Sequence, residues 1–116
     1  MEISVVGFGP GDSSLLTQSA VEAINSADII VGTRHQLDLI SNPDAERFEL
    51  SPHNKTLERV IIGLELGKYN GRVVFLSEGD PGIMSVAPTL IGKFGQDVRI
   101  VPGISLVQMA FARLGL

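Results

Sequence analysis

Short apolar runs recur along the chain and predict the strands of a sheet. Residues 28–32 and 72–77 are nearly continuous runs, typical of strands that are covered on both faces. The run at 72–77 is the strongest and predicts a central strand, whereas 47–50 alternates between polar and apolar residues and predicts an edge strand. The predicted strands cover residues 3–6, 28–32, 47–50, 72–77 and 97–101.

Between these runs, apolar residues recur with the spacing of helices that lie on a sheet. Thr17 is a suitable N-cap, Pro88 fits the first turn of a helix, and Asn70-Gly71 fits a helix end. A short helix at 34–40 is expected to end before Asn42-Pro43-Asp44. The apolar stripes are Leu16, Ala20, Ala23, Ile24 and Ala27; Leu57, Val60, Ile61 and Leu64; Leu90, Ile91 and Phe94; and Leu106, Val107, Ala110, Phe111 and Leu114.

Strands and helices alternate along the whole chain, which predicts an α/β fold with three layers. The expected architecture is a mostly parallel five-stranded sheet with helices on both faces. A length of 116 residues fits one domain with one core. In an open parallel sheet, the turns from strand to helix lie along one edge, and ligands bind there.

Three glycine-rich turns each follow a predicted strand, namely Gly7–Asp12, Ser77–Gly82 and Val101–Ser105. Glycine lets a ligand approach the backbone closely, so we expect these turns to close on one small molecule. The first turn differs from the dinucleotide-binding pattern because its third glycine comes one residue early and Pro10 stiffens it. No convincing acidic residue follows the second strand, where Gly32-Thr33-Arg34 stands instead.

Each turn also has a purely structural interpretation. The first fits a tight structural turn about equally well, and Gly79-Asp80-Pro81-Gly82 is ordinary turn chemistry when taken alone. Asp80 at the ligand edge would accept hydrogen bonds from an amine or hydroxyl. Ser105 would cap a helix or contact a ligand. Arg34 and His35 follow the second strand and would either pair with substrate carboxylates or remain solvated.

The composition narrows the classes of partner and site. The net charge is −4 with no basic run, which argues against a nucleic-acid surface. The chain has no cysteine and only two histidines, so we expect no disulfide and no metal site. No apolar stretch approaches the roughly 20 residues of a membrane span, and no leader opens the chain. We therefore expect a cytoplasmic protein without a membrane partner.

Taken together, the three turns resemble those of the tetrapyrrole (corrin/porphyrin) methylase family. The opening Val5–Asp12 with Leu15-Leu16-Thr17 is similar to the family's first glycine-rich motif. Gly79–Gly82 resembles its Gly-Asp-Pro turn, and Val101–Ser105 resembles its Val-Pro-Gly-Ile-Ser segment. The segment 27–37 and the residues Val107-Gln108 and 112–115 are most similar to the precorrin-6Y or cobalt-precorrin-7 C5-methyltransferase branch.

The resemblance implies methylation of a corrin precursor in cobalamin biosynthesis, with S-adenosylmethionine as cofactor. Residues 1–116 would form the N-terminal domain, and a second domain, absent from this chain, would complete the cofactor cleft. The isolated chain is then expected to be inactive, and the resemblance implies a homodimer. No catalytic residue is assigned, with Asp80 a weak candidate. By resemblance, the cofactor pocket would be lined by Pro10, Glu78, Gly79, Asp80, Ile83, Ser105 and Leu106, while Gly9, Gly11, Asp12, Arg34 and His35 would lie near the tetrapyrrole.

Other functions stay open at this point. Related methylases with the same architecture act on uroporphyrinogen, diphthine precursors or ribosomal RNA, although the acidic charge argues against RNA. A stand-alone module that binds a metabolite without catalysis is the other alternative. Glu78 and Leu106 support that alternative, because both differ from the residues usual in the family's turns.

Overall fold

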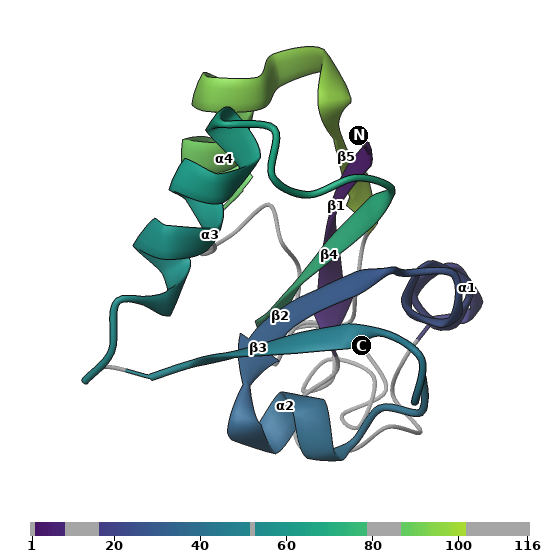
Figure 1. The fold of residues 1–116 in the computed structure, drawn as a ribbon. Helices are drawn as coiled ribbons and strands as arrows, with labels where there is room; N and C mark the ends of the chain where they lie inside the picture. Colours follow the sequence, from purple (N-terminus) through teal and green to yellow (C-terminus); the bar gives the residue numbers. More distant parts are fainter. Residues whose placement is uncertain (1, 9–16, 52, 79–86, 102–116) are drawn as a thin grey trace, which may run out of the picture.

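Five strands form a single sheet in the order β3-β2-β4-β1-β5 (Figure 1). The structure is a computed structural model, and it describes residues 2–8, 17–51, 53–78 and 87–101. All neighbouring strands in this sheet run parallel. The predicted α/β fold is confirmed, with β4 at the centre and β3 at an edge as expected. The strands are β1 (Glu2–Phe8), β2 (Ile29–Thr33), β3 (Glu46–Leu50), β4 (Arg72–Glu78) and β5 (Val98–Val101).

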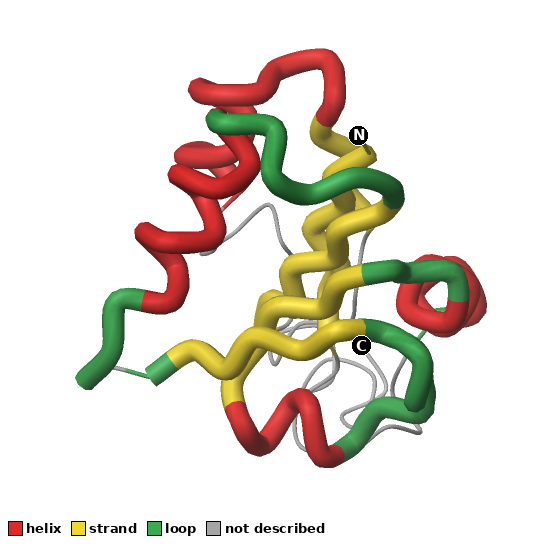
Figure 2. Tube along the Cα trace, in the orientation of Figure 1, coloured by secondary structure: helices red, strands yellow, loops and turns green. Residues whose placement is uncertain are grey.

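Helices cover both faces of the sheet. Figure 1 and the tube in Figure 2 show α1 on one side and the pair α3 and α4 on the other. The predicted helix over 106–114 lies outside the described residues. The described helices are α1 (Gln18–Asn25), α2 (Arg34–Asp38), α3 (Thr56–Glu65) and α4 (Ala87–Phe94), the last followed by a 3-10 turn at Gly95–Asp97.

Alternate residues of β1, β2 and β4 enter two separate apolar clusters, because successive side chains of a strand point to opposite faces. On β4, Val74 and Leu76 join the cluster beneath α1 and α2, which also holds Ala20, Ile24 and Leu37. On the opposite face, Val73 and Phe75 join the cluster beneath α3 and α4, with Val60, Leu64 and Leu90. The sheet is therefore buried on both sides, as the near-continuous apolar run predicted.

Local hydrogen bonds set where the first two helices begin. The Thr17 hydroxyl accepts a hydrogen bond from the Ala20 amide at 3.1 Å, which confirms the predicted N-cap. Thr33 caps α2 in the same way, and the Thr33 amide donates a hydrogen bond to Gln36 Oε1 at 2.9 Å. The buried Asn42 amide donates to the carbonyls of Ile24 and Ala27 near the end of α1.

The predicted end of the third helix was wrong. α3 ends at Glu65, and Gly67 adopts a positive φ of 70° that lets Lys68 donate back to the Gly63 carbonyl at 2.9 Å. Gly71 has a φ of 91°, but it leads into β4 rather than ending a helix. Asn70-Gly71 therefore marks the turn before β4 and not the end of α3.

Most other predicted boundaries shift by one or two residues, at both ends of β1 and β2, the start of β3 and β5, and the end of β4. Asp28 and Asp97 precede their strands rather than opening them. Asp28 Oδ2 instead accepts a hydrogen bond from the Arg72 amide, with 2.8 Å between nitrogen and oxygen. The Asp28 side chain therefore links the starts of β2 and β4. The short helix expected at 34–40 ends at Asp38.

Candidate functional site

The direction in which the chain crosses the sheet reverses between β1 and β4. From β1 the chain passes through α1 to β2, and from β4 it passes through α4 to β5, in the opposite direction along the sheet. Parallel crossovers are right-handed, so the reversal puts α1 and α4 on opposite faces. β1 and β4 are neighbours, and a crevice opens at such a reversal beyond the carboxyl ends of the strands. The crevice between β4 and β1 is therefore the candidate site.

The three glycine-rich segments are joined to three neighbouring strands at this same end. Phe8 pairs with Glu78, and Val6 pairs with Val101, so β4, β1 and β5 end side by side. The segments beginning at residues 9, 79 and 102 continue from these ends. The strand order thus brings together starting points that are far apart in the sequence.

Most predicted cofactor and substrate residues lie outside the described residues. Glu78 is the last residue of β4, and the structure describes its backbone. Its pairing with Phe8 places it at the crevice. The predicted residues outside the described ranges are Gly9, Pro10, Gly11, Asp12, Gly79, Asp80, Ile83, Ser105 and Leu106.

Arg34 and His35 are the two predicted site residues with described side chains. They open α2 directly after β2, at the carboxyl end of the sheet, and both are exposed. β2 lies beside β4, so both residues stand next to the crevice rather than within it. In the described part of the chain, the ion pairs lie elsewhere, between Arg72 and Glu2 and between Lys93 and Glu65.

A hollow of about 370 Å³ lies at the outer part of the carboxyl end, where β2 and β3 end. We call it the outer hollow. Its walls come from the ends of β2 and β3 and from the start of α3, which is why the sequence pattern missed it. Its lining residues are Thr33, Leu50, Ser51, Asn54, Leu57 and Glu58.

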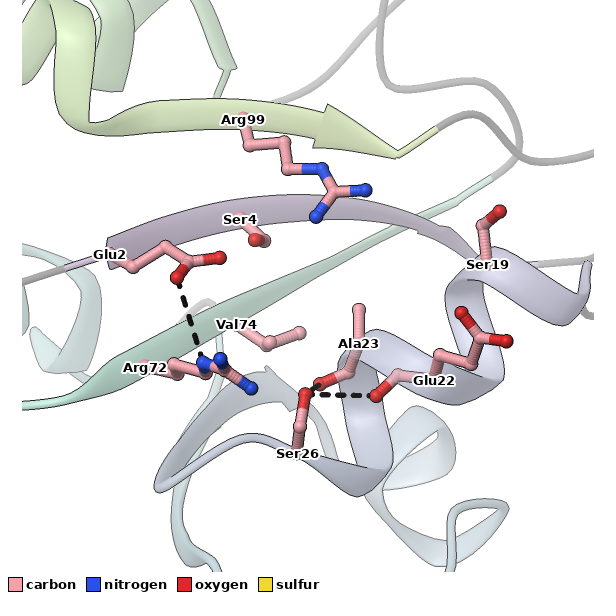
Figure 3. Close-up of a pocket in the computed structure, with 9 residues that line it drawn as sticks. All are labelled: Glu2, Ser4, Ser19, Glu22, Ala23, Ser26, Arg72, Val74 and Arg99. Carbon is pink, nitrogen blue, oxygen red and sulfur yellow. Dashed lines mark hydrogen bonds and ion pairs between the residues drawn. The ribbon is translucent and has the colours of Figure 1, made fainter.

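A second hollow, of about 310 Å³, lies toward the opposite end of the sheet (Figure 3). We call it the amino-end hollow; Glu2, Ser4, Arg72 and Arg99 line it together with residues of α1. Figure 3 shows the ion pair from Arg72 Nε to Glu2 Oε2, at 3.6 Å, beside it. Glu2 and Arg72 pair at the starts of β1 and β4, so this hollow is remote from the strand ends that lead into the glycine-rich segments.

The described ranges hold neither a cluster of metal-ligating side chains nor a helix suited to a membrane. No three His, Cys, Asp or Glu side chains gather there as a metal would require. No helix within them has the length and apolar character to cross a membrane.

Two of the solved structures that this chain resembles are methyltransferases. The methyltransferase CobJ matches 98% of this chain with a TM-score of 0.78 and 30% identity, over 51% of its own chain. Uroporphyrin-III C-methyl transferase from Thermus thermophilus, solved in complex with S-adenosyl homocysteine, matches the whole chain with a TM-score of 0.70 and 26% identity, over 49% of its own chain.

Curated relatives include a cobalamin biosynthesis protein and a cobalt-precorrin-7 methyltransferase. Cobalamin biosynthesis protein CbiHC of Archaeoglobus fulgidus is 36% identical over 120 residues, which cover 98% of this chain and 27% of the relative. Cobalt-precorrin-7 C(5)-methyltransferase of Salmonella typhimurium is 35% identical over 115 residues, which cover 98% of this chain and 55% of the relative. The chain thus spans about half the length of this methyltransferase and about a quarter of CbiHC.

The family model for tetrapyrrole (corrin/porphyrin) methylases matches residues 2–116, nearly the whole chain. The parallel sheet, the strand order and the relatives agree with this match. The chain belongs to the tetrapyrrole (corrin/porphyrin) methylase family.

Proposed function

We propose that the complete protein containing this chain is an S-adenosylmethionine-dependent C-methyltransferase of cobalamin biosynthesis. Its proposed substrate is a corrin precursor, and its reaction is C5 methylation of cobalt-precorrin-7 or C5,15 methylation of precorrin-6Y. One observation carries the proposal: the strands that lead into all three glycine-rich segments end side by side at the crevice between β4 and β1. The similarity to a cobalt-precorrin-7 C(5)-methyltransferase supports the choice of reaction.

The residues of β1 and β4 at the end of the crevice are small, as expected where a cofactor lies against the backbone. Gly7 and Ser77 pair with each other one position before the ends of β1 and β4, and both are buried. Neither has a bulky side chain, so a ligand that lies over the strand ends would be able to approach the backbone closely. S-adenosylmethionine would supply a methyl group bound to a sulfonium sulfur.

The chain's own residues would bind and align the reactants. We propose that Asp80 accepts hydrogen bonds from amino or hydroxyl groups of the cofactor. Alignment of two bound reactants is worth roughly 7–11 kcal/mol of barrier lowering in favourable cases. Asp80 is also the candidate for removing a proton from the methylated carbon, a role secondary to binding. The proposed cofactor residues are Pro10, Glu78, Gly79, Asp80, Ile83, Ser105 and Leu106.

The tetrapyrrole would lie against the same edge. Arg34 and His35 are exposed beside the crevice, where an arginine can bind a substrate carboxylate through two parallel hydrogen bonds. Gly9, Gly11 and Asp12 would lie near the macrocycle. We also propose that residues 1–116 act as the first domain of a two-domain enzyme, that the chain alone is inactive, and that the complete enzyme is a cytoplasmic homodimer.

The test is methyl transfer by the complete protein. The purified protein is incubated with S-adenosylmethionine labelled in its methyl group and with cobalt-precorrin-7 or precorrin-6Y, and the products are examined by mass spectrometry. We expect a labelled methyl group on the corrin precursor. Transfer to neither corrin precursor, by a folded protein that binds the cofactor, would contradict the proposal.

A second candidate is methylation of uroporphyrinogen. The likeness to uroporphyrin-III C-methyl transferase, with a TM-score of 0.70, favours keeping it in the same assay. Uroporphyrinogen III is offered under identical conditions. Labelling of uroporphyrinogen without labelling of either corrin precursor would select this second reaction.

A further inference from the structure

The amino-end hollow lies between α1 and the first residues of β1, β4 and β5 (Figure 3). In the register of the sheet, Ser4 pairs with Val74 on one side and with Arg99 on the other, and all three residues line the hollow. Four residue steps along β1 separate Ser4 from Phe8, which is about 13 Å. The hollow is therefore well removed from the strand ends that form the crevice.

Small side chains on two elements explain why a hollow exists here. Ser19, Ala23 and Ser26 follow one another at helical spacing, so they share one face of α1, and all three line the hollow. On the sheet side, β1 contributes Ser4, whereas two positions further along Val6 enters the core cluster beneath α1 and α2. The resulting volume of about 310 Å³ is at the low end of the roughly 300–1,000 Å³ of ligand pockets, which suits a small molecule.

Ser4 brings a buried hydroxyl group to this hollow. The exposed fraction of Ser4 is 6%, yet its hydroxyl makes no hydrogen bond with any described residue. Buried polar groups nearly always have a hydrogen-bond partner, either in the protein or in a molecule bound to it. Because Ser4 lines the hollow, its hydroxyl indicates that a polar group of a ligand belongs there.

Two opposite charges line the hollow without forming an ion pair. Arg99 comes from β5 and Glu22 from α1, and Figure 3 shows both side chains beside the hollow. Within the described residues, the Glu22 carboxylate accepts a single long hydrogen bond of 3.4 Å from Gln18, and neither charge belongs to an ion pair. Arg72 and Glu2, which also line the hollow, are paired with each other. The hollow therefore offers one cation and one anion to a ligand.

These two charges select the class of ligand. A simple anion would be attracted by Arg99 and repelled by Glu22, and a simple cation would meet the reverse. A zwitterion satisfies both charges, because a carboxylate accepts hydrogen bonds from a guanidinium while an ammonium group donates to a carboxylate. Ala23 and Val74 supply an apolar part of the wall. Together these groups match an α-amino acid whose side chain is short and aliphatic.

We propose that the amino-end hollow binds a free α-amino acid with a short aliphatic side chain. The Arg99 guanidinium binds its carboxylate, and the Glu22 carboxylate binds its ammonium group. The Ser4 hydroxyl donates a hydrogen bond to the ligand carboxylate, and the aliphatic side chain packs against Ala23 and Val74. The proposal adds a second ligand site to the one at the crevice and does not depend on which methyl transfer the complete protein catalyses.

The test is equilibrium dialysis of the complete protein against radiolabelled L-valine. We expect saturable binding that Arg99→Gln and Glu22→Gln each weaken by about tenfold, because each variant removes a charged hydrogen bond. Ser4→Val should abolish binding, because the larger side chain fills the hollow, and it should not lower the melting temperature, since valine suits a buried strand position. Absence of saturable binding, or full binding by Ser4→Val, would overturn the proposal.

Matched control variants come from the opposite face of the sheet. Arg59 and Glu58 are exposed on α3, and Arg59→Gln and Glu58→Gln make the same two changes of charge. Both variants should bind L-valine like the parent protein. If Arg59→Gln weakens binding as much as Arg99→Gln, or Glu58→Gln as much as Glu22→Gln, the effect comes from net charge and the site is wrong.

Competition experiments test the zwitterion and the place of binding. Isovalerate lacks the ammonium group and isobutylamine lacks the carboxylate, so each should displace labelled L-valine at least about tenfold less well than unlabelled L-valine does. Equal displacement by either analogue would overturn the proposal.

Saturating S-adenosyl homocysteine should leave L-valine bound, and displacement by it would assign L-valine to the crevice instead. Retained L-valine binding by a protein that methylates no tetrapyrrole would contradict the proposed function alone.

Discussion

The two ends of the sheet are built from different kinds of residue. At the amino end, Glu2 and Arg72 form an ion pair, and the Asp28 carboxylate accepts a hydrogen bond from the Arg72 backbone amide. At the carboxyl end, the small residues Gly7 and Ser77 face each other across β1 and β4. Side chains at the amino end bind the chain's own backbone and charges, whereas the carboxyl end of β1 and β4 carries small residues. This difference separates residues that stabilise the fold from those proposed to bind the cofactor.

The largest expected effect is on cofactor affinity at the carboxyl end. Asp80→Ala in the complete protein should weaken S-adenosylmethionine binding by about 30-fold or more, because a ligand donor loses a charged acceptor. The melting temperature should stay close to that of the parent protein. Calorimetric titration measures the affinity, and Asp80→Asn serves as the control that keeps the shape and one acceptor. Unchanged affinity in Asp80→Ala would remove this residue from the site.

At the amino end, the next largest effect should be on stability alone. Asn42 is buried and its amide donates to carbonyls near the end of α1, so Asn42→Ala should lower the free energy of unfolding by about 2 kcal/mol. Asn42→Asp keeps the size but loses the donor and should be at least as destabilising. Urea unfolding measures both variants. A stable Asn42→Ala protein with weakened cofactor binding would reverse the assignment of the two ends.

Gly71→Ala should cost about 1–2 kcal/mol, again without loss of ligand affinity. Gly71 has a φ of 91°, which side chains rarely adopt, and an added Cβ would meet the Asp28 carboxylate. Gly67→Ala is a useful comparison, because Gly67 also has a positive φ but a Cβ there meets nothing. Thermal melting should therefore rank Gly71→Ala as the more destabilising of the two. The opposite ranking would contradict the role given to Asp28.

The smallest effect is expected at the exposed ion pair. Glu2→Gln should change the free energy of unfolding by less than about 0.5 kcal/mol, since both partners are half-exposed and the atoms are 3.6 Å apart. Urea unfolding at low and high salt measures it. A loss above 1 kcal/mol that salt does not reduce would show that the pair does more than an ordinary surface contact.

The sequence predicted the elements of the sheet because its signals are local. The apolar run of β4 is continuous, and the Thr17 cap lies three residues from its partner amide. The end of α3 was mispredicted because Gly71 is needed for another reason. The Asp28 carboxylate, which is distant in sequence, packs against Gly71 in the folded sheet and leaves no room for a Cβ there. The spacing of residues along the chain carries no information about such long-range contacts.

The candidate site was predicted in the same uneven way. Glycine-rich turns after strands indicated the ligand edge, and the strand order now joins all three to neighbouring strands. The outer hollow was missed because Thr33, Leu50 and Asn54 come from three segments, none with a motif of its own. The roles of Pro10, Asp80 and Ser105 remain predictions, and they lie outside the described residues.

Hydrogen–deuterium exchange of the complete protein, with and without S-adenosyl homocysteine, tests most directly whether the three glycine-rich segments bind one ligand. We predict slower exchange in peptides from 9–16, 79–86 and 102–108 together, with little change in peptides from 66–72 at the amino end. Protection of a single segment, or protection centred on the amino-end hollow, would contradict a shared cofactor site.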